Sequence, residues 1–196
     1  MSSRETIDLW DAEAATFDEA ADHGLRDPSV RRVWRELLTS VMPAPPARIA
    51  DLGCGTGTLS LLLADEGHPV DGVDVSPEMV RLAHEKAGDR DEVTFAVGDA
   101  ADLGLSPQSY DVVLCRHVLW VMPDPASALR HWIDLLAPDG RLVLVEGSWS
   151  TGAGLTAAQT VALVEGTGRP AELRMLPEAA YWGHEITDER YLVVSR

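Results

Sequence analysis

From residue 47 onward, short apolar segments alternate with longer segments whose apolar residues have helical spacing. The apolar segments predict strands at residues 47–52, 69–75, 93–97, 110–115, 141–146, 172–176 and 190–194. The longer segments predict helices at residues 58–66, 76–87, 125–136 and 156–165. Strands that are apolar at nearly every position belong to parallel sheets covered by helices on both faces. We therefore expect an α/β fold with a doubly wound, mostly parallel sheet of about seven strands.

Two helices are expected before the sheet. The first covers residues 4–21, is acidic and has its apolar residues at helical spacing. The second begins at Asp27, a favourable N-cap residue followed by proline, and ends before the proline-rich stretch 43–46. A length of 196 residues suits one domain. We predict one domain with two parts, residues 1–42 and residues 47–196.

Charge limits the partners that the chain can bind. It has 32 acidic and 16 basic residues, which give a formal net charge of −16 at pH 7. Nucleic-acid binding depends on clustered lysine and arginine, so we expect no DNA or RNA partner. A neutral or cationic small substrate is easier to accommodate.

The chain shows no sign of export or membrane insertion. Its first ten residues lack the basic and then apolar pattern of a secretory signal, and no apolar stretch approaches the length of a membrane span. The two cysteines, Cys54 and Cys115, fall near predicted strand ends and suggest no disulfide framework. We expect a cytoplasmic protein without a membrane partner.

The first predicted strand runs into a glycine-rich turn, Gly-Cys-Gly-Thr-Gly at residues 53–57, with Asp51 just before it. Ligands of doubly wound sheets bind beyond the carboxyl ends of the strands, where glycines allow close approach. The spacing differs from the Gly-x-Gly-x-x-Gly of dinucleotide sites, and no Lys-Ser/Thr follows as in a P-loop. A plain strand-to-helix turn is the alternative.

Acidic residues also end the next two predicted strands. Asp74 closes the second strand, where a carboxylate can accept hydrogen bonds from both ribose hydroxyls. Asp99 follows the third strand, where a carboxylate can accept from an adenine amino group. Each has a structural alternative: Asp74 can cap the following helix, and Asp99 can belong to a turn. Their order, together with the glycine turn, favours a nucleoside site.

These segments resemble the class I S-adenosylmethionine-dependent methyltransferases, especially the ubiquinone-biosynthesis type and other small-molecule enzymes. The resemblance covers nearly the whole chain, and the matching motifs are residues 51–57, 74–79, 98–100 and 138–142. It implies S-adenosylmethionine as the cofactor. It also implies a Rossmann-like sheet of order 3-2-1-4-5-7-6, with the last-numbered strand antiparallel.

The resemblance extends to the N-terminal part. Trp10-Asp11 and Phe17-Asp18 resemble the family's aromatic–Asp repeat, so residues 1–42 are expected to cap the active site. Met79 is expected to pack on the adenine. The cofactor-contacting residues that the resemblance implies are Trp10, Phe17, Asp51, Gly53, Cys54, Gly55, Asp74, Val75, Met79, Gly98, Asp99, Ala100 and Arg116.

One departure from related families narrows the substrate. Enzymes that methylate adenine or protein glutamine have an Asn/Asp-Pro-Pro-aromatic motif after the fourth strand, where this chain reads Cys-Arg-His-Val at residues 115–118. Catechol enzymes hold a metal with several acids, and this chain has no clear equivalent. We expect neither substrate class and no metal.

Two residues are candidates for the base in methyl transfer. His117 follows the fourth strand, and its ordinary pKa suits proton transfer near neutrality. Glu146 ends the fifth strand and is the second candidate. The alternatives are a backbone hydrogen bond for His117 and a helix-cap or solvent contact for Glu146. Trp120 and Trp149 are expected to line the substrate pocket with them.

The sequence therefore predicts a methyltransferase that acts on an oxygen, nitrogen or carbon nucleophile of a small molecule, secondary metabolites being one class. Two alternatives remain. A module that binds the cofactor without catalysis is one, and a nicotinamide-dependent oxidoreductase, disfavoured by the glycine spacing, is the other. We expect a monomer or a homodimer.

Overall fold

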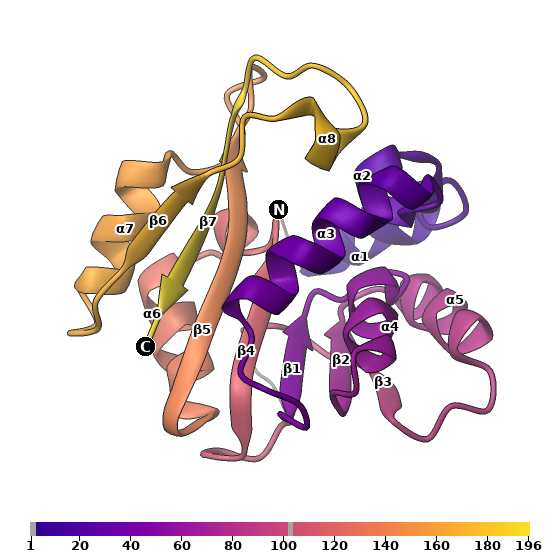
Figure 1. Ribbon diagram of the computed structural model, residues 1–196, viewed down its shortest axis with the longest axis horizontal. Helices are drawn as coiled ribbons and strands as arrows, with labels where there is room; N and C mark the ends of the chain where they lie inside the picture. The colour runs from indigo at the N-terminus through magenta and orange to yellow at the C-terminus, as the bar shows by residue number, and fades with distance from the viewer. Residues whose placement is uncertain (1–2, 102–103) are drawn as a thin grey trace.

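A computed structural model describes residues 3–101 and 104–196 and contains one seven-stranded sheet (Figure 1). The strand order is β3-β2-β1-β4-β5-β7-β6, and β7 runs antiparallel to both of its neighbours. This order and direction confirm the expected fold. The strands are β1 (Ile49–Leu52), β2 (Val70–Asp74), β3 (Val93–Val97), β4 (Tyr110–Arg116), β5 (Leu136–Ser148), β6 (Glu172–Met175) and β7 (Glu189–Ser195).

Helices cover both faces of the sheet (Figure 1). In β4, Val112 and Leu114 pack on the face covered by α3, α4 and α5, whereas Val113 and Cys115 pack on the face covered by α6 and α7. The helices are α1 (Ser3–Glu13), α2 (Ala21–Gly24), α3 (Pro28–Val41), α4 (Thr58–Asp65), α5 (Pro77–Ala87), α6 (Pro125–Asp134), α7 (Ala157–Glu165) and α8 (Ala179–Trp182), with 3-10 turns η1 (Phe17–Glu19) and η2 (Leu119–Val121).

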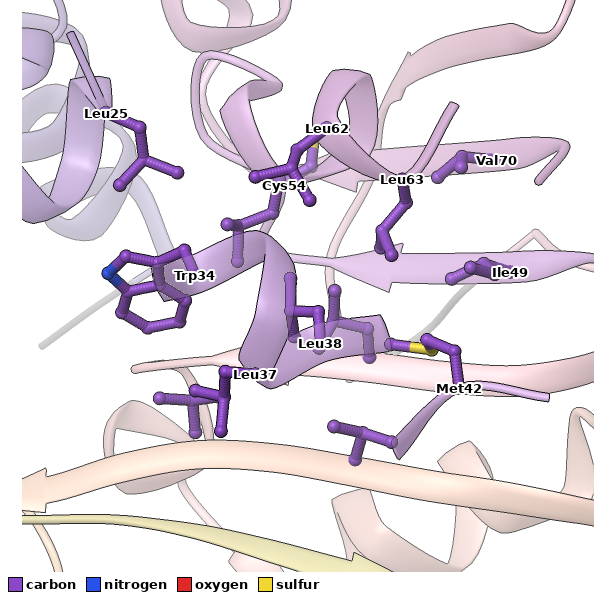
Figure 2. Packing of buried hydrophobic residues seen from close by; sticks show 14 of the residues in the cluster. Leu25, Trp34, Leu37, Leu38, Met42, Ile49, Cys54, Leu62, Leu63 and Val70 are labelled. Atoms are coloured by element: carbon purple, nitrogen blue, oxygen red, sulfur yellow. The ribbon is translucent and has the colours of Figure 1, made fainter. Parts of the chain in front are cut away.

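Helix α3 ties the N-terminal part to the sheet. It begins as expected: the Asp27 carboxylate accepts a hydrogen bond from the Ser29 amide at 2.7 Å. Its apolar side buries Trp34 and Leu38 completely, next to α4 and β1 (Figure 2). Trp34 Nε1 also donates to the Tyr181 carbonyl at 2.7 Å, which joins α3 to α8. Burial of one such large apolar side chain contributes about 3 kcal/mol to stability.

The N-terminal segment differs from the single helix expected over residues 4–21. Helix α1 ends at Glu13, and a separate 3-10 turn, η1, follows at residues 17–19. The cause is a contact with the glycine turn, because Thr56 Oγ1 donates to the Asp18 carboxylate at 2.6 Å. Tertiary contact here overrides local helix propensity.

Two further differences lie toward the C-terminus. Strand β5 begins at Leu136 and passes through an irregular pairing with β4 near Tyr110, whereas the sequence predicted its start at residue 141. The short helix α8 was not predicted, since four residues carry no recognisable periodicity. Among the described helices, none is long and apolar enough to span a membrane.

Candidate functional site

One cavity of about 820 Å³ opens where β1, β2 and β4 end, below α1, η1 and α2. Residues far apart in the sequence meet there because parallel strands end at the same edge of a sheet. All thirteen residues expected to contact the cofactor line this cavity: Trp10, Phe17, Asp51, Gly53, Cys54, Gly55, Asp74, Val75, Met79, Gly98, Asp99, Ala100 and Arg116.

The glycine turn brings bare backbone to the cavity wall. Gly53 and Gly55 have φ values of 70° and 54°, a region that favours glycine. A Cβ atom at Gly53 would lie 2.2 Å from Val118 Cγ2, and one at Gly55 would lie 3.1 Å from Phe17 Cε1. The turn therefore requires glycine both for its conformation and for its close packing.

Asp74 fastens the end of β2 to this turn. One carboxylate oxygen accepts from the Gly55 amide at 2.8 Å, and the other accepts from the Ser76 amide at 2.9 Å. Burial raises the pKa of Asp74, although the amide hydrogen bonds oppose the shift. The N-cap of α5 is Ser76, whose Oγ accepts from the Met79 amide at 3.1 Å, so Asp74 is not the helix cap. Its oxygens keep capacity to accept from hydroxyl groups in the cavity.

The other two acids expected to contact the cofactor differ in exposure. Asp99 is exposed, and its Oδ1 accepts from the Ala101 amide at 2.8 Å, as in the turn considered as its alternative. Asp51 is 2% exposed and accepts from Ser60 Oγ at 2.6 Å. Burial raises the pKa of Asp51 to about 6 and holds the pKa of the Cys54 thiol well above its usual value.

The N-terminal segment is anchored over the glycine turn by two acids. Asp11 accepts from Ser76 Oγ at the start of α5. Asp18 accepts from Thr56 and pairs with Lys86 Nζ at 2.6 Å. These contacts hold Trp10 and Phe17, the residues next to the two acids, over the glycine turn. The sequence predicted the aromatic–Asp pattern but not the partners of the acids.

The aromatic residues of this segment form a small cluster. The Phe17 ring stacks on His23 with centroids 4.3 Å apart and meets Trp10 edge-on at 6.4 Å. His23 lines the cavity as well, and burial is the main cause that lowers its pKa. The cavity therefore has an aromatic wall on its N-terminal side.

Arg116, at the end of β4, makes an ion pair inside the cavity. Its guanidinium binds the Asp22 carboxylate and donates to the Asp22 carbonyl at 2.7 Å. It also lies 4.6 Å from the ring centre of Trp34. Burial lowers the pKa of Arg116, and the partner carboxylate opposes this. The arginine thus connects α2, β4 and α3 at the base of the cavity.

His117 lies in an aromatic cluster at the inner end of the cavity. Its ring is edge-on to Trp149 at 5.0 Å and stacked on Trp182 at 6.2 Å, and Trp120 donates to its carbonyl at 2.9 Å. Burial and the charge of Arg116 hold its pKa well below 6.5, so the ring is neutral near pH 7. His117 Nε2 is buried and has no hydrogen-bond partner among the described residues. Trp120 and Trp149 line the cavity beside it, as expected.

Glu146 requires a correction. It is completely buried and is not one of the described residues that line the cavity. Its Oε1 instead accepts from the amides of Val118 and Leu119 at 3.1 and 2.8 Å, which supports the loop after β4. Burial raises its pKa to about 8. In the described structure Glu146 therefore supports this loop, as in the helix-cap alternative, and is not placed to contact a substrate in the cavity.

The sequence missed Asp22 and Arg190, which also line the cavity. Asp22 belongs to α2, a helix of four residues that no pattern announces. Arg190 lies in β7 opposite Gly147, where a Cβ atom would lie 2.8 Å from Arg190 Cδ. A glycine inside β5 was the available signal for a large side chain on the neighbouring strand.

Within residues 3–101 and 104–196, no three His, Cys, Asp or Glu side chains gather in a way that could hold a metal ion. The expected absence of a metal nevertheless stays a prediction.

The sequence has relatives among known methyltransferases. Residues 50–144 match a family model described as a methyltransferase domain. Ubiquinone biosynthesis O-methyltransferase of Xanthomonas campestris pv. campestris is 37% identical over 51% of this chain and 43% of its own length. Demethylmenaquinone methyltransferase of Clavibacter sepedonicus is 33% identical over 69% of this chain and 58% of its own length. The chain thus spans about half the length of these curated relatives.

Solved structures show the same architecture. Magnesium protoporphyrin IX methyltransferase of Synechocystis PCC 6803 with bound S-adenosylmethionine superposes with a TM-score of 0.67 at 26% identity, over 85% of this chain and 77% of that one. The [4+2]-cyclase SpnF has a TM-score of 0.73 at 20% identity, over 85% and 80%, which is a likeness of fold alone. Residues 50–144 thus belong to a methyltransferase domain, and the strand order of the sheet is the one expected for the class I S-adenosylmethionine-dependent methyltransferases.

Proposed function

We propose that this chain binds S-adenosylmethionine and transfers its methyl group to an oxygen, nitrogen or carbon nucleophile of a small molecule. The observation that carries the proposal is the cavity, in which all thirteen expected cofactor-contacting residues meet His117, Trp120 and Trp149. The named methyltransferases among the relatives support the same reaction class.

The residues of the cavity suit an adenosine-bearing cofactor. The turn at Gly53 and Gly55 has no side chains of its own and lines the cavity with backbone, which allows a ligand to approach closely. The Asp74 carboxylate has room to accept from ribose hydroxyls. A volume of about 820 Å³ lies within the range of small-molecule sites and leaves space for an acceptor beside the cofactor.

When bound, S-adenosylmethionine supplies a methyl group that is already electrophilic. The chain then has to hold the nucleophile in line with that group and exclude water. Trp10 and Phe17 cover the N-terminal side of the cavity with aromatic surface, which favours a cationic sulfonium. His117 accepts the proton of a hydroxyl or amine nucleophile, since its ring is neutral and its Nε2 finds no partner in the described part of the chain.

The proposal includes the organisation of the protein. Residues 1–42 form a cap over the site, a view supported by the anchoring of Asp11 and Asp18. The protein works in the cytoplasm, as a monomer or homodimer, without a nucleic-acid partner. The buried free thiols of Cys54 and Cys115 and the net charge of −16 support this description.

Two measurements test the proposed function. Titration calorimetry with S-adenosylhomocysteine tests cofactor binding, and its release from S-adenosylmethionine across a panel of acceptors tests turnover. We expect binding and turnover with at least one acceptor. Binding without turnover indicates the alternative, a module that binds the cofactor without catalysis. Binding of a nicotinamide dinucleotide in its place, or no uptake at millimolar concentration, overturns the proposal.

A further inference from the structure

The inner end of the cavity holds a second arginine, which is not among the expected cofactor contacts. Arg190 belongs to β7, and its side chain is only 10% exposed. Its guanidinium lies 4.8 Å from the ring centre of Trp149 and 5.3 Å from that of Trp182. Aromatic faces hold the group in place while its edge remains available for hydrogen bonds.

Arg190 keeps hydrogen-bonding capacity that no neighbour uses. Its Nη2 binds the Asp188 carboxylate at 3.1 Å, but its buried Nε has no partner among the residues that the structure describes. A buried N–H without a partner costs free energy, and the rest of the guanidinium lines the cavity, where it can bind an acceptor group. Guanidinium groups match carboxylates in both charge and geometry.

The strand order separates Arg190 from the cofactor end of the cavity. The expected adenine and ribose contacts, Asp99 and Asp74, follow β3 and β2, and the glycine turn follows β1. β7 is three strands beyond β1 in the order β1-β4-β5-β7. Since neighbouring strands lie about 4.8 Å apart, the backbone of β7 is about 14 Å from that of β1. The Arg190 guanidinium lies over Trp149 and Trp182, on the side of the cavity expected to hold the acceptor.

The charges at this end favour an anion. Two guanidinium groups, Arg116 and Arg190, line it together with the Asp22 carboxylate, and Arg116 is paired with Asp22. His117 adds a neutral ring between the two arginines and the tryptophans. Asp188 binds Arg190 from one side but does not belong to the described lining of the cavity. Both arginines are thus ion-paired, and the guanidinium donors that Asp188 leaves unused on Arg190 are the ones that can bind an anion in the cavity.

The surfaces next to Arg190 are apolar and aromatic. Trp120 and Trp149 lie 5.5 Å apart between ring centres, and both line the cavity. Val121 and Met122 extend this apolar wall toward the opening. An acceptor with an apolar body and one acidic group would contact both the apolar wall and Arg190.

We propose that the methyl acceptor is an organic acid whose carboxylate binds Arg190 and whose apolar body lies against Trp120 and Trp149. This inference rests on the proposed function and names its substrate class. It revises the expectation that a chain of net charge −16 accommodates neutral or cationic substrates more easily, because two arginines line this end of the cavity although the chain as a whole is acidic.

Matched acids and amides test the proposal. Calorimetry measures 4-hydroxybenzoate, 4-hydroxycinnamate, indole-3-acetate and octanoate, each against its amide, with and without S-adenosylhomocysteine. We expect at least one acid to bind about tenfold or more tightly than its amide, because the amide lacks the charge-assisted hydrogen bonds. Equal binding of every pair, or no binding of any acid, overturns the proposal.

Variants assign the effect to Arg190. Arg190→Met is expected to abolish the preference for the acid and leave the affinity for S-adenosylhomocysteine within about twofold. Arg130→Met, an exposed position on α6, is the charge-matched control and is expected to keep the preference. If Arg190→Met weakens S-adenosylhomocysteine as strongly as the acid, the arginine serves the cofactor's own carboxylate and the proposal fails.

The proposal can still be tested if the variant does not fold or if S-adenosylhomocysteine does not bind. If Arg190→Met does not fold, the wild-type comparison of acids with amides still decides, and the Nε–H signal of arginine in ¹⁵N spectra shows whether an acid perturbs a buried guanidinium. If S-adenosylhomocysteine does not bind at all, the proposed function fails, whereas the preference for acids, measured without it, is judged separately.

Discussion

The Asp74 carboxylate accepts a hydrogen bond from the Gly55 amide at 2.8 Å, which fastens the end of β2 to the turn that follows β1. A second hydrogen bond, from the Ser76 amide at 2.9 Å, connects the same side chain to the start of α5. One acid therefore sets the position of the turn and of the helix at once. Any group that it binds in the cavity is placed relative to both.

Replacement of Asp74 tests this relationship. Asp74→Ala removes both amide contacts and the acceptor for ribose hydroxyls, so we expect affinity for S-adenosylhomocysteine to fall by about tenfold or more. Titration calorimetry measures the change. Asp89→Asn, at an exposed site beyond α5, is the control and should leave the affinity unaltered. Unchanged affinity in Asp74→Ala would contradict the ribose assignment.

The glycine turn makes a prediction about stability. Gly53→Ala places a Cβ atom 2.2 Å from Val118 Cγ2 at a residue with φ of 70°. We expect a loss of about 2–4 kcal/mol in the free energy of unfolding, from strain and overpacking together. Gly104→Ala is the matched control, since a Cβ atom there meets nothing within 4 Å in the described structure. Chemical denaturation compares them, and equal midpoints would show that the turn tolerates a side chain.

His117 makes a prediction about turnover. His117→Ala is expected to lower the single-turnover rate by about a hundredfold if the nucleophile carries a proton, because a positioned base is lost. Cofactor affinity should stay within about twofold, which separates this role from one in cofactor binding. His131→Ala on α6 is a control outside the described cavity lining. A rate equal to that of the wild type would leave His117 with the backbone and packing role that the sequence also allowed.

The raised pKa of Glu146 predicts how the stability of the fold changes with pH. Its pKa is raised to about 8 in the folded chain, so the folded state holds a proton that the unfolded state releases near its ordinary value of 4.5. The stability from this proton is complete below about pH 4.5 and is lost as the pH rises through 8. Glu146→Gln keeps an acceptor for the amides of Val118 and Leu119 and cannot ionise.

The variant and the wild type should therefore have similar stability at pH 5. By pH 9, Glu146→Gln should be the more stable, by an amount on the order of 4 kcal/mol. Urea denaturation at both pH values gives the comparison. A difference that is the same at pH 5 and pH 9 would mean that Glu146 does not titrate in this range.

Local patterns predicted the strand ends and the cap of α3 correctly. The strand ends, the glycine turn and the cap of α3 at Asp27 depend on residues close in sequence, so spacing and residue type carry enough information. The order of the sheet came from the family resemblance rather than from the pattern. The break after Glu13 was missed because it depends on Asp18 reaching Thr56, a contact across 38 positions.

The placement of Glu146 and Arg190 depends on which way their side chains face. Residues alternate along β5, so Glu146 lies on the same side as Leu142 and Leu144, which pack into the core under α6 and α7. A position at a strand end does not show which side of the sheet the side chain faces unless the register of the strand is known. Arg190 depends on the pairing of β7 with β5, which also lies beyond local patterns.

The two ends of the cavity are formed by different parts of the chain. The expected adenosine contacts come from residues before 101, whereas Arg116, His117, Trp120, Trp149 and Arg190 come after it. A chimera that joins the first hundred residues to the later half of another member of the family would keep the nucleoside end and exchange the acceptor wall. Diversity in what is methylated can thus arise by change in the later half alone.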